Sequence, residues 1–143
     1  MKYLGVDPGD ARIGLAISDE QGILARPLTI LKHVSRPENA RRIIEIAERE
    51  ECAAIVVGIP YDSNGGVGPR ARASLKLIDA IRVQCELDIL SWDESGSSKA
   101  SEEALINLVS KKRRSQEHHD DFAAMLILTD FLRNQSDMAR RHE

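Results

Sequence analysis

The chain of 143 residues has few aromatic side chains and few cysteines. Aromatic residues make up 3% of the sequence, and the two cysteines, Cys52 and Cys85, lie far apart. With so few rings, recognition of splayed bases by stacking is not expected. The cysteines have neither a CxxC spacing nor a Cys/His pairing, which argues against a zinc site and against a disulfide framework. We expect both to be small hydrophobic residues of the interior.

Long apolar runs and an excess of positive charge are also missing. No run approaches the ~20 apolar residues of a membrane-spanning helix, and the first residues lack the apolar region and cleavage site of a secretory signal. We therefore expect a cytoplasmic protein without a membrane partner. The formal net charge is −3, so any nucleic-acid binding must depend on local clusters of cations. Such clusters are Arg70 with Arg72, Lys111-Lys112-Arg113-Arg114, and Arg140 with Arg141.

The length fits one domain, which we expect over residues 1–134, followed by a flexible C-terminal tail at 135–143. Apolar alternation, helical spacing and turn residues predict the order of the elements. Three strands come first, and helices then alternate with two further strands. The predicted strands are 2–6, 13–18, 27–31, 53–59 and 87–92, and the predicted helices are 37–50, one carrying residues 71–82, 98–111 and 120–133.

Three antiparallel strands followed by two parallel strands joined through helices is the order of the ribonuclease H-like fold. The sequence therefore predicts an α/β protein with a mixed five-stranded sheet and helices on both faces. Ligands of open α/β sheets bind outside the carboxyl ends of the strands. Side chains at those ends are accordingly the first candidates for a functional site.

Two carboxylates stand where predicted strands end. Asp7 follows the strand at 2–6 within Gly5-Val6-Asp7-Pro8-Gly9, and Glu94 follows the strand at 87–92. The two would lie near each other if their strands were neighbours. Asp120 and Asp121 open a helix whose apolar face would draw its first turn toward the sheet, so either of them is a candidate third carboxylate.

Three converging carboxylates repel one another unless a cation neutralises them, and all-oxygen ligation favours Mg²⁺ or Mn²⁺ over zinc. In phosphodiester hydrolysis such a cluster holds two ions, one activating water and one stabilising the leaving oxygen. The pattern thus favours a two-metal nuclease site. The ordinary local roles stay open at this point: a turn aspartate for Asp7, a solvated strand end for Glu94, and a helix cap for Asp120 or Asp121.

Several segments, taken together, resemble the YqgF/RuvX family over roughly residues 1–134. None of them is specific alone, but their order and spacing agree with the family pattern. They are Gly5-Val6-Asp7-Pro8-Gly9 with Arg12-Ile13-Gly14-Leu15-Ala16, then Val56-Val57-Gly58-Ile59-Pro60, the Gly-rich run at 64–72, Trp92-Asp93-Glu94, and the run from Asp120 to Leu128.

The resemblance implies a ribonuclease H-like nuclease of the bacterial cytoplasm, with Asp7, Glu94 and Asp120 as its catalytic and metal-binding triad. The family pattern places two residues and then Ala-Ala after the helix aspartate, which selects Asp120 over Asp121. Two substrates are implied, namely the 5′ end of pre-16S ribosomal RNA and the branched DNA of a Holliday junction. A junction resolvase is expected to act as a symmetric dimer, whereas an RNA-trimming enzyme can be a monomer, so the oligomeric state stays open.

The chain departs from the family pattern beside Glu94. The family usually has arginine at the next position, where this chain has Ser95. Serine supplies neither the charge nor the planar fork with which a guanidinium binds phosphate. Other cations are candidates for contacting nucleic acid in its place. They are Arg12 in the turn after Asp7, Arg70 and Arg72 at the start of a helix, and Lys111, Lys112, Arg113 and Arg114 in a predicted basic loop.

Three other functions are compatible with parts of the sequence. The run Gly66-Val67-Gly68-Pro69-Arg70-Ala71 matches a dinucleotide-binding pattern, but it lies well beyond the preceding strand end rather than at it. Actin-like ATPases share an Asp-x-Gly turn such as Asp7-Pro8-Gly9, yet they bind nucleotide between two lobes, and this length supplies one. The third function is that of a nucleic-acid-binding module with weak catalysis, whose affinity for nucleic acid would be sensitive to salt.

Overall fold

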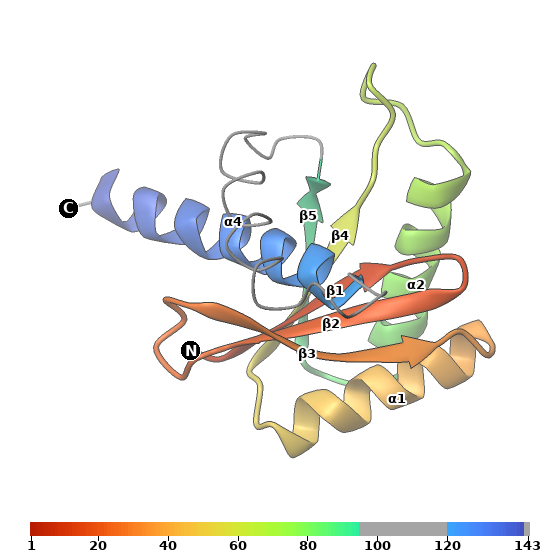
Figure 1. Cartoon of the computed structure of the whole chain (residues 1–143), viewed down its shortest axis with the longest axis horizontal. Helices are drawn as coiled ribbons and strands as arrows, with labels where there is room; N and C mark the ends of the chain where they lie inside the picture. The colour runs from red at the N-terminus through yellow and green to blue at the C-terminus, as the bar shows by residue number, and fades with distance from the viewer. Residues whose placement is uncertain (95–119, 142–143) are drawn as a thin grey trace, which may run out of the picture.

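The computed structural model describes residues 1–94 and 120–141 (Figure 1). Strands and helices follow one another in the predicted order within these ranges, and the predicted helix at 98–111 lies outside them. The elements are β1 (Tyr3–Pro8), β2 (Arg12–Ser18), β3 (Ala25–Lys32), α1 (Arg36–Arg49), β4 (Ala54–Ile59), α2 (Pro69–Gln84), β5 (Asp88–Asp93) and α4 (Asp120–Arg141).

The strands form one five-stranded sheet in the order β3-β2-β1-β4-β5. Strand β2 pairs antiparallel with β1 and β3, whereas β4 pairs parallel with β1 and β5. The prediction of a mixed sheet is thus confirmed. A tight turn joins β1 to β2, in which the N–H of Gly9 donates to the carbonyl oxygen of Arg12 over 2.9 Å. A side chain at Gly9 would collide with that carbonyl oxygen, so glycine is required there.

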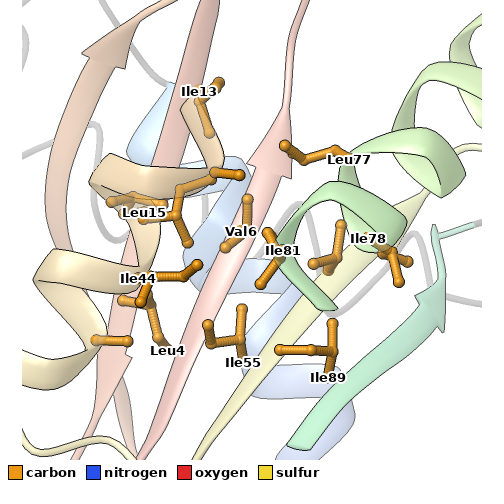
Figure 2. Close-up of a cluster of buried hydrophobic side chains, with 14 of the residues drawn as sticks. Leu4, Val6, Ile13, Leu15, Ile44, Ile55, Leu77, Ile78, Ile81 and Ile89 are labelled. Atoms are coloured by element: carbon orange, nitrogen blue, oxygen red, sulfur yellow. The ribbon is translucent and has the colours of Figure 1, made fainter. Parts of the chain in front are cut away.

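Helices α1 and α2 cover one face of the sheet. In α1 the apolar residues recur with helical spacing, and Ser35 caps its first turn by accepting a hydrogen bond from the N–H of Glu38 (3.3 Å). The buried side chains of α1 and α2 pack on every second residue of the strands, as Figure 2 shows for Leu4 and Val6 of β1. This packing is the larger of the two apolar clusters in the described part of the chain.

Helix α4 covers the opposite face (Figure 1). Its apolar side chains contact Ala16 of β2 and Val56 of β4, and the ring of Phe131 meets Tyr3 and Trp92 edge-on, with centroids 5.2 and 6.0 Å apart. Helices therefore cover both faces, as predicted. Within residues 1–94 and 120–141, no helix is both long and apolar enough to cross a membrane.

Helix α4 extends further than the sequence indicated. It continues to Arg141, whereas the prediction ended it at 133 and placed a tail from residue 135. The periodic apolar positions end at Leu132, and the residues that follow are mostly polar. The apolar pattern thus marks only the part of the helix that packs on the sheet, and residues 135–141 continue the helix beyond it.

Gly5 of β1 sets how closely α4 approaches the sheet. A Cβ at this position would lie 2.9 Å from the Cβ of Leu128 and 3.2 Å from the carbonyl oxygen of Ala124. Neither atom is the far end of a flexible side chain, so the helix itself would have to move. The absence of a side chain at Gly5 therefore allows α4 to pack directly on β1.

We expect Gly5→Ala to lower the free energy of unfolding by about 1–3 kcal/mol, the usual cost of overpacking a core. Chemical denaturation of the two proteins measures the difference. Gly66→Ala is the matched control, because its added Cβ meets only the side chains of Asn64 and Asp62, at 3.1 Å and beyond, in an exposed loop. Equal stabilities of Gly5→Ala and the unaltered protein would contradict the close packing.

Candidate functional site

Asp7 is the second-last residue of β1 and lies on the face of the sheet that α4 covers. It pairs with Gly14 of β2. Because side chains alternate along a strand, Asp7 points to the same side as Gly5, the residue over which α4 packs. Asp7 is half-buried. The carboxylate is therefore held by a regular strand near the end of the helix-covered face.

Glu94 follows the last residue of β5 and folds back over the neighbouring strand. A Cβ built on Gly58 of β4 would lie 2.6 Å from Oε1 of Glu94 and 3.2 Å from its Cγ. The same Cβ would lie 2.5 Å from Cδ1 of Ile127 in α4. Oε1 of Glu94 is buried. The side chain of Glu94 thus occupies the space that any residue other than glycine would fill at position 58.

The expectation that the strands of Asp7 and Glu94 are neighbours is wrong. Strand β4 lies between β1 and β5. Val6 pairs with Val57, so the next residue of each strand brings Asp7 and Gly58 to the same level of the sheet. Glu94 therefore reaches over Gly58, which has no side chain, at the level of Asp7 on the next strand.

The first turn of α4 lies at the same edge of the sheet. Ala124 and Leu128 contact Gly5, and Phe131 contacts Tyr3 further back along β1. The helix therefore runs opposite to β1, and its first residue, Asp120, lies toward the carboxyl end of that strand. The role of Asp120 as the third carboxylate stays a prediction. The side chains of Asp120 and Asp121 are outside the described part of the structure.

The donor chemistry of the site fits a hard divalent cation. Both described members, Asp7 and Glu94, offer carboxylate oxygens, and Glu94 occupies the space over Gly58. Among the described residues, no cluster of three or more His, Cys, Asp or Glu side chains is arranged to hold a metal, and the side chain of Asp120 is not among them. Burial raises the pKa of the Cys52 thiol, in keeping with its predicted role as a small hydrophobic residue.

The residues predicted to contact nucleic acid do not lie on one face of the sheet. Arg12 is exposed at the start of β2, and alternation with the buried Ile13 directs it to the face of Asp7. Arg70 and Arg72 lie in the first turn of α2, on the other face of the sheet. Ser95 and the basic run Lys111, Lys112, Arg113 and Arg114 lie outside the described residues.

Sequence reasoning missed two contributors to this end of the molecule. Gly58 interrupts the apolar run Ile55-Val56-Val57, and a glycine inside a strand is the usual mark of a close approach. Asn39 is a polar residue on the buried face of α1, only 2% exposed. Both signals were present in the sequence, but neither reveals which neighbour the residue contacts.

The chain has known relatives over most of its length. Residues 1–134 match the family described as RuvX, Holliday junction resolvase. A relative from Desulforudis audaxviator named "Putative pre-16S rRNA nuclease" is 34% identical over 135 residues, covering 94% of this chain and 96% of its own. A relative of the same name from Bacillus thuringiensis is 39% identical over 134 residues, covering 92% and 98%.

Solved structures share the fold at low sequence identity. RuvC of Thermus thermophilus, in complex with a Holliday junction substrate, aligns with a TM-score of 0.63 at 17% identity and covers 95% of this chain and 96% of its own. The fowlpox virus Holliday junction resolvase aligns with a TM-score of 0.59 at 15% identity, covering 94% and 99%. These likenesses establish a ribonuclease H-like fold. The family match and the identities to its relatives show that this chain belongs to the RuvX family.

Proposed function

We propose that this protein is a metal-dependent endonuclease that hydrolyses phosphodiester bonds in structured nucleic acid, acting in the cytoplasm on the 5′ end of pre-16S ribosomal RNA. The observation that carries the proposal is the gap at Gly58, across which Glu94 approaches the strand level of Asp7. Two acidic side chains at one end of the sheet, one of them with a buried oxygen, offer carboxylate ligands to a divalent cation. Such an arrangement is expected of a catalytic site rather than of a structural one.

In this proposal Asp7, Glu94 and Asp120 hold one or two Mg²⁺ or Mn²⁺ ions. When bound, such ions supply an activated water and stabilise the charge on the leaving oxygen. Asp7 is fixed by a strand paired on both sides, and Glu94 by the space over Gly58. Asp120 comes from the first turn of α4, whose helix dipole also favours negative charge near it. The ions that meet the substrate phosphate would therefore be held by oxygen ligands whose positions the sheet has already set.

RNA is the favoured substrate because the relatives at 34% and 39% identity carry the name of a pre-16S ribosomal RNA nuclease. A Holliday junction is the second candidate, and the description of the family favours it. Both substrates are structured, and with 3% aromatic residues in the chain we expect recognition of backbone and shape rather than of stacked bases.

The substrate is identified by incubating the purified full-length protein with labelled pre-16S ribosomal RNA, a labelled four-way DNA junction and ATP, each with Mg²⁺, Mn²⁺ or EDTA. We expect endonucleolytic cuts near the 5′ end of the RNA in either metal and none in EDTA. Cleavage of the junction alone would transfer the proposal to the second candidate. Turnover of ATP alone, or binding without any cleavage, would reject the nuclease assignment in favour of a nucleotide-binding or nucleic-acid-binding module.

The oligomeric state follows from the same sample. Paired cuts at a junction require two sites related by symmetry, so a resolvase acts as a homodimer, whereas trimming of one RNA end requires a single site. Because RNA is the favoured substrate, we expect a monomer. The solution mass of the active species, measured by light scattering, decides between the two states.

A further inference from the structure

A pocket of ≈ 60 Å³ opens on the face of the sheet opposite to Asp7, between α1, α2 and the β1–β2 turn. Its apolar wall includes Ile13 of β2 and Leu77 of α2, both labelled in Figure 2. Its polar residues come from the β1–β2 turn, the end of β3 and the starts of α1 and α2. The polar residues are Asp10, His33, Arg36, Asn39 and Arg70.

Asn39 is the buried polar member of this lining. Its side chain is 2% exposed, and Oδ1 accepts a hydrogen bond from the N–H of Val34 over 3.0 Å. That bond fixes the amide orientation and leaves Nδ2 as a donor. Nδ2 donates to no other residue in the described part of the chain. Nδ2 is not among the side-chain atoms that are sealed from solvent, so it can donate to an acceptor that enters the pocket.

Arg36 and Arg70 place positive charge on the pocket. Both are exposed, and neither forms an ion pair with any residue of 1–94 or 120–141. One carboxylate, that of Asp10, lines the same pocket. Two guanidinium groups therefore face one carboxylate, and the excess charge favours an anion. Guanidinium forks suit the oxygens of phosphate in particular.

The start of α2 adds to this field. Gly68, at the N-cap, supplies no side-chain hydrogen bond to the first turn, and Pro69 follows it. The carboxylate of Asp62 lies beside Gly68, but Asp62 does not line the pocket. Arg70 lines the pocket from the first turn of α2, whose N-terminal end has the carboxylate of Asp62 beside it, so the charge at the pocket comes from the Arg70 side chain.

We propose that this pocket binds a backbone phosphate of the nucleic-acid substrate, with Arg36 and Arg70 pairing to its oxygens and Nδ2 of Asn39 donating to one of them. The inference rests on the proposed function only in assigning the phosphate to the substrate. The turn residues Pro8, Gly9 and Asp10 line the pocket and directly follow Asp7, so a strand that crosses this turn reaches both places. The pocket would thereby supply a phosphate contact in place of the arginine that the family usually has at the position of Ser95.

The test measures binding in EDTA, where cleavage makes no contribution. Inorganic phosphate is titrated into ¹⁵N-labelled full-length protein while the side-chain amide resonances of Asn39 are followed. A fluorescent single-stranded RNA is then bound at several salt concentrations, once with a 5′-phosphate and once with a 5′-hydroxyl. The variant is Arg36→Ala with Arg70→Ala. Its matched control is Arg49→Ala with Lys76→Ala, which removes the same charge from exposed positions of α1 and α2 outside the pocket.

We expect phosphate to shift the Asn39 amide saturably and the RNA to compete with it. The pocket variant should bind RNA about tenfold more weakly or worse, and the slope of log Kd against log salt should fall by about 1.4 for two lost contacts to a single strand. Asn39→Asp, which keeps the Oδ1 acceptor and replaces the donor with an anionic oxygen, should lose phosphate binding as well.

Equal losses in the pocket variant and its control would overturn the proposal, and so would an unmoved Asn39 amide. Preference for the 5′-phosphorylated RNA by more than tenfold would reassign the pocket to a terminal phosphate. If the pocket binds as expected but no substrate is cut in Mg²⁺ or Mn²⁺, the nuclease assignment fails and the phosphate site stands. If cleavage occurs and the pocket variants bind phosphate and RNA normally, the phosphate site fails and the nuclease assignment stands.

Discussion

Replacing Asp7 with asparagine is expected to reduce cleavage in Mg²⁺ or Mn²⁺ by well over 100-fold. Loss of a residue that merely orients a metal ligand commonly costs 10- to 100-fold, and Asp7 is proposed to be a ligand itself. Asparagine preserves the shape of the side chain but removes its charge. The rate of product formation from labelled pre-16S ribosomal RNA at saturating metal measures the effect.

Folding should survive this change. Asparagine keeps the size of the side chain, and β1 stays paired on both sides, so we expect the free energy of unfolding in EDTA to change little. Asp93→Asn is the matched control, since Asp93 is exposed and alternation directs it away from the face of Glu94. Cleavage by Asp7→Asn at the rate of the control would show that Asp7 is not part of the site.

The second large effect is expected for Gly58→Ala. The added Cβ would lie 2.5 Å from Cδ1 of Ile127 and 2.6 Å from Oε1 of Glu94, so both of these side chains must shift. We expect the free energy of unfolding to fall by about 1–3 kcal/mol. Cleavage should fall at least about 100-fold, because a shift of about 1 Å at a catalytic group is enough for that loss. Chemical denaturation and the RNA cleavage assay measure the two effects separately.

A double variant separates packing from chemistry. Ile127→Val removes only Cδ1, the atom that the new Cβ would strike, and should cost about 0.5–1.5 kcal/mol alone. In Gly58→Ala with Ile127→Val the stability losses should be less than additive, since the steric conflict is relieved. Cleavage should stay low, because Glu94 is still displaced. Full recovery of cleavage together with stability would mean that Gly58 serves packing alone.

The sequence predicted the sheet well because its strands and turns have local signals. Apolar segments on either side of the Pro8-Gly9 turn indicated β1 and β2, and the continuous apolar run indicated β4, since a parallel central strand is buried on both faces. The end of α4 was predicted too early for the same reason. Residues 135–141 lie beyond the part of the helix that packs on the sheet, so no apolar period marks them.

The site was predicted only in part, because its assembly depends on contacts across the sheet. Strand ends indicated Asp7 and Glu94, but the sequence does not state the strand order, so the intervening β4 was missed. The role of Gly58 depends on its contact with Glu94, which is 36 positions further along the chain. The pocket that includes Arg36 and Asn39 is formed by the starts of two helices, and periodicity along either helix alone does not reveal it.

The packing of α4 over Gly5 has a consequence for synthesis of the chain. In chain order β1 precedes α4, so Asp7 is synthesised well before the helix that covers its face of the sheet. A chain stopped before α4 would expose the apolar side chains of β1, β2 and β4 that this helix buries. It would also lack Asp120. We therefore expect that removal of α4 by proteolysis ends both activity and solubility together.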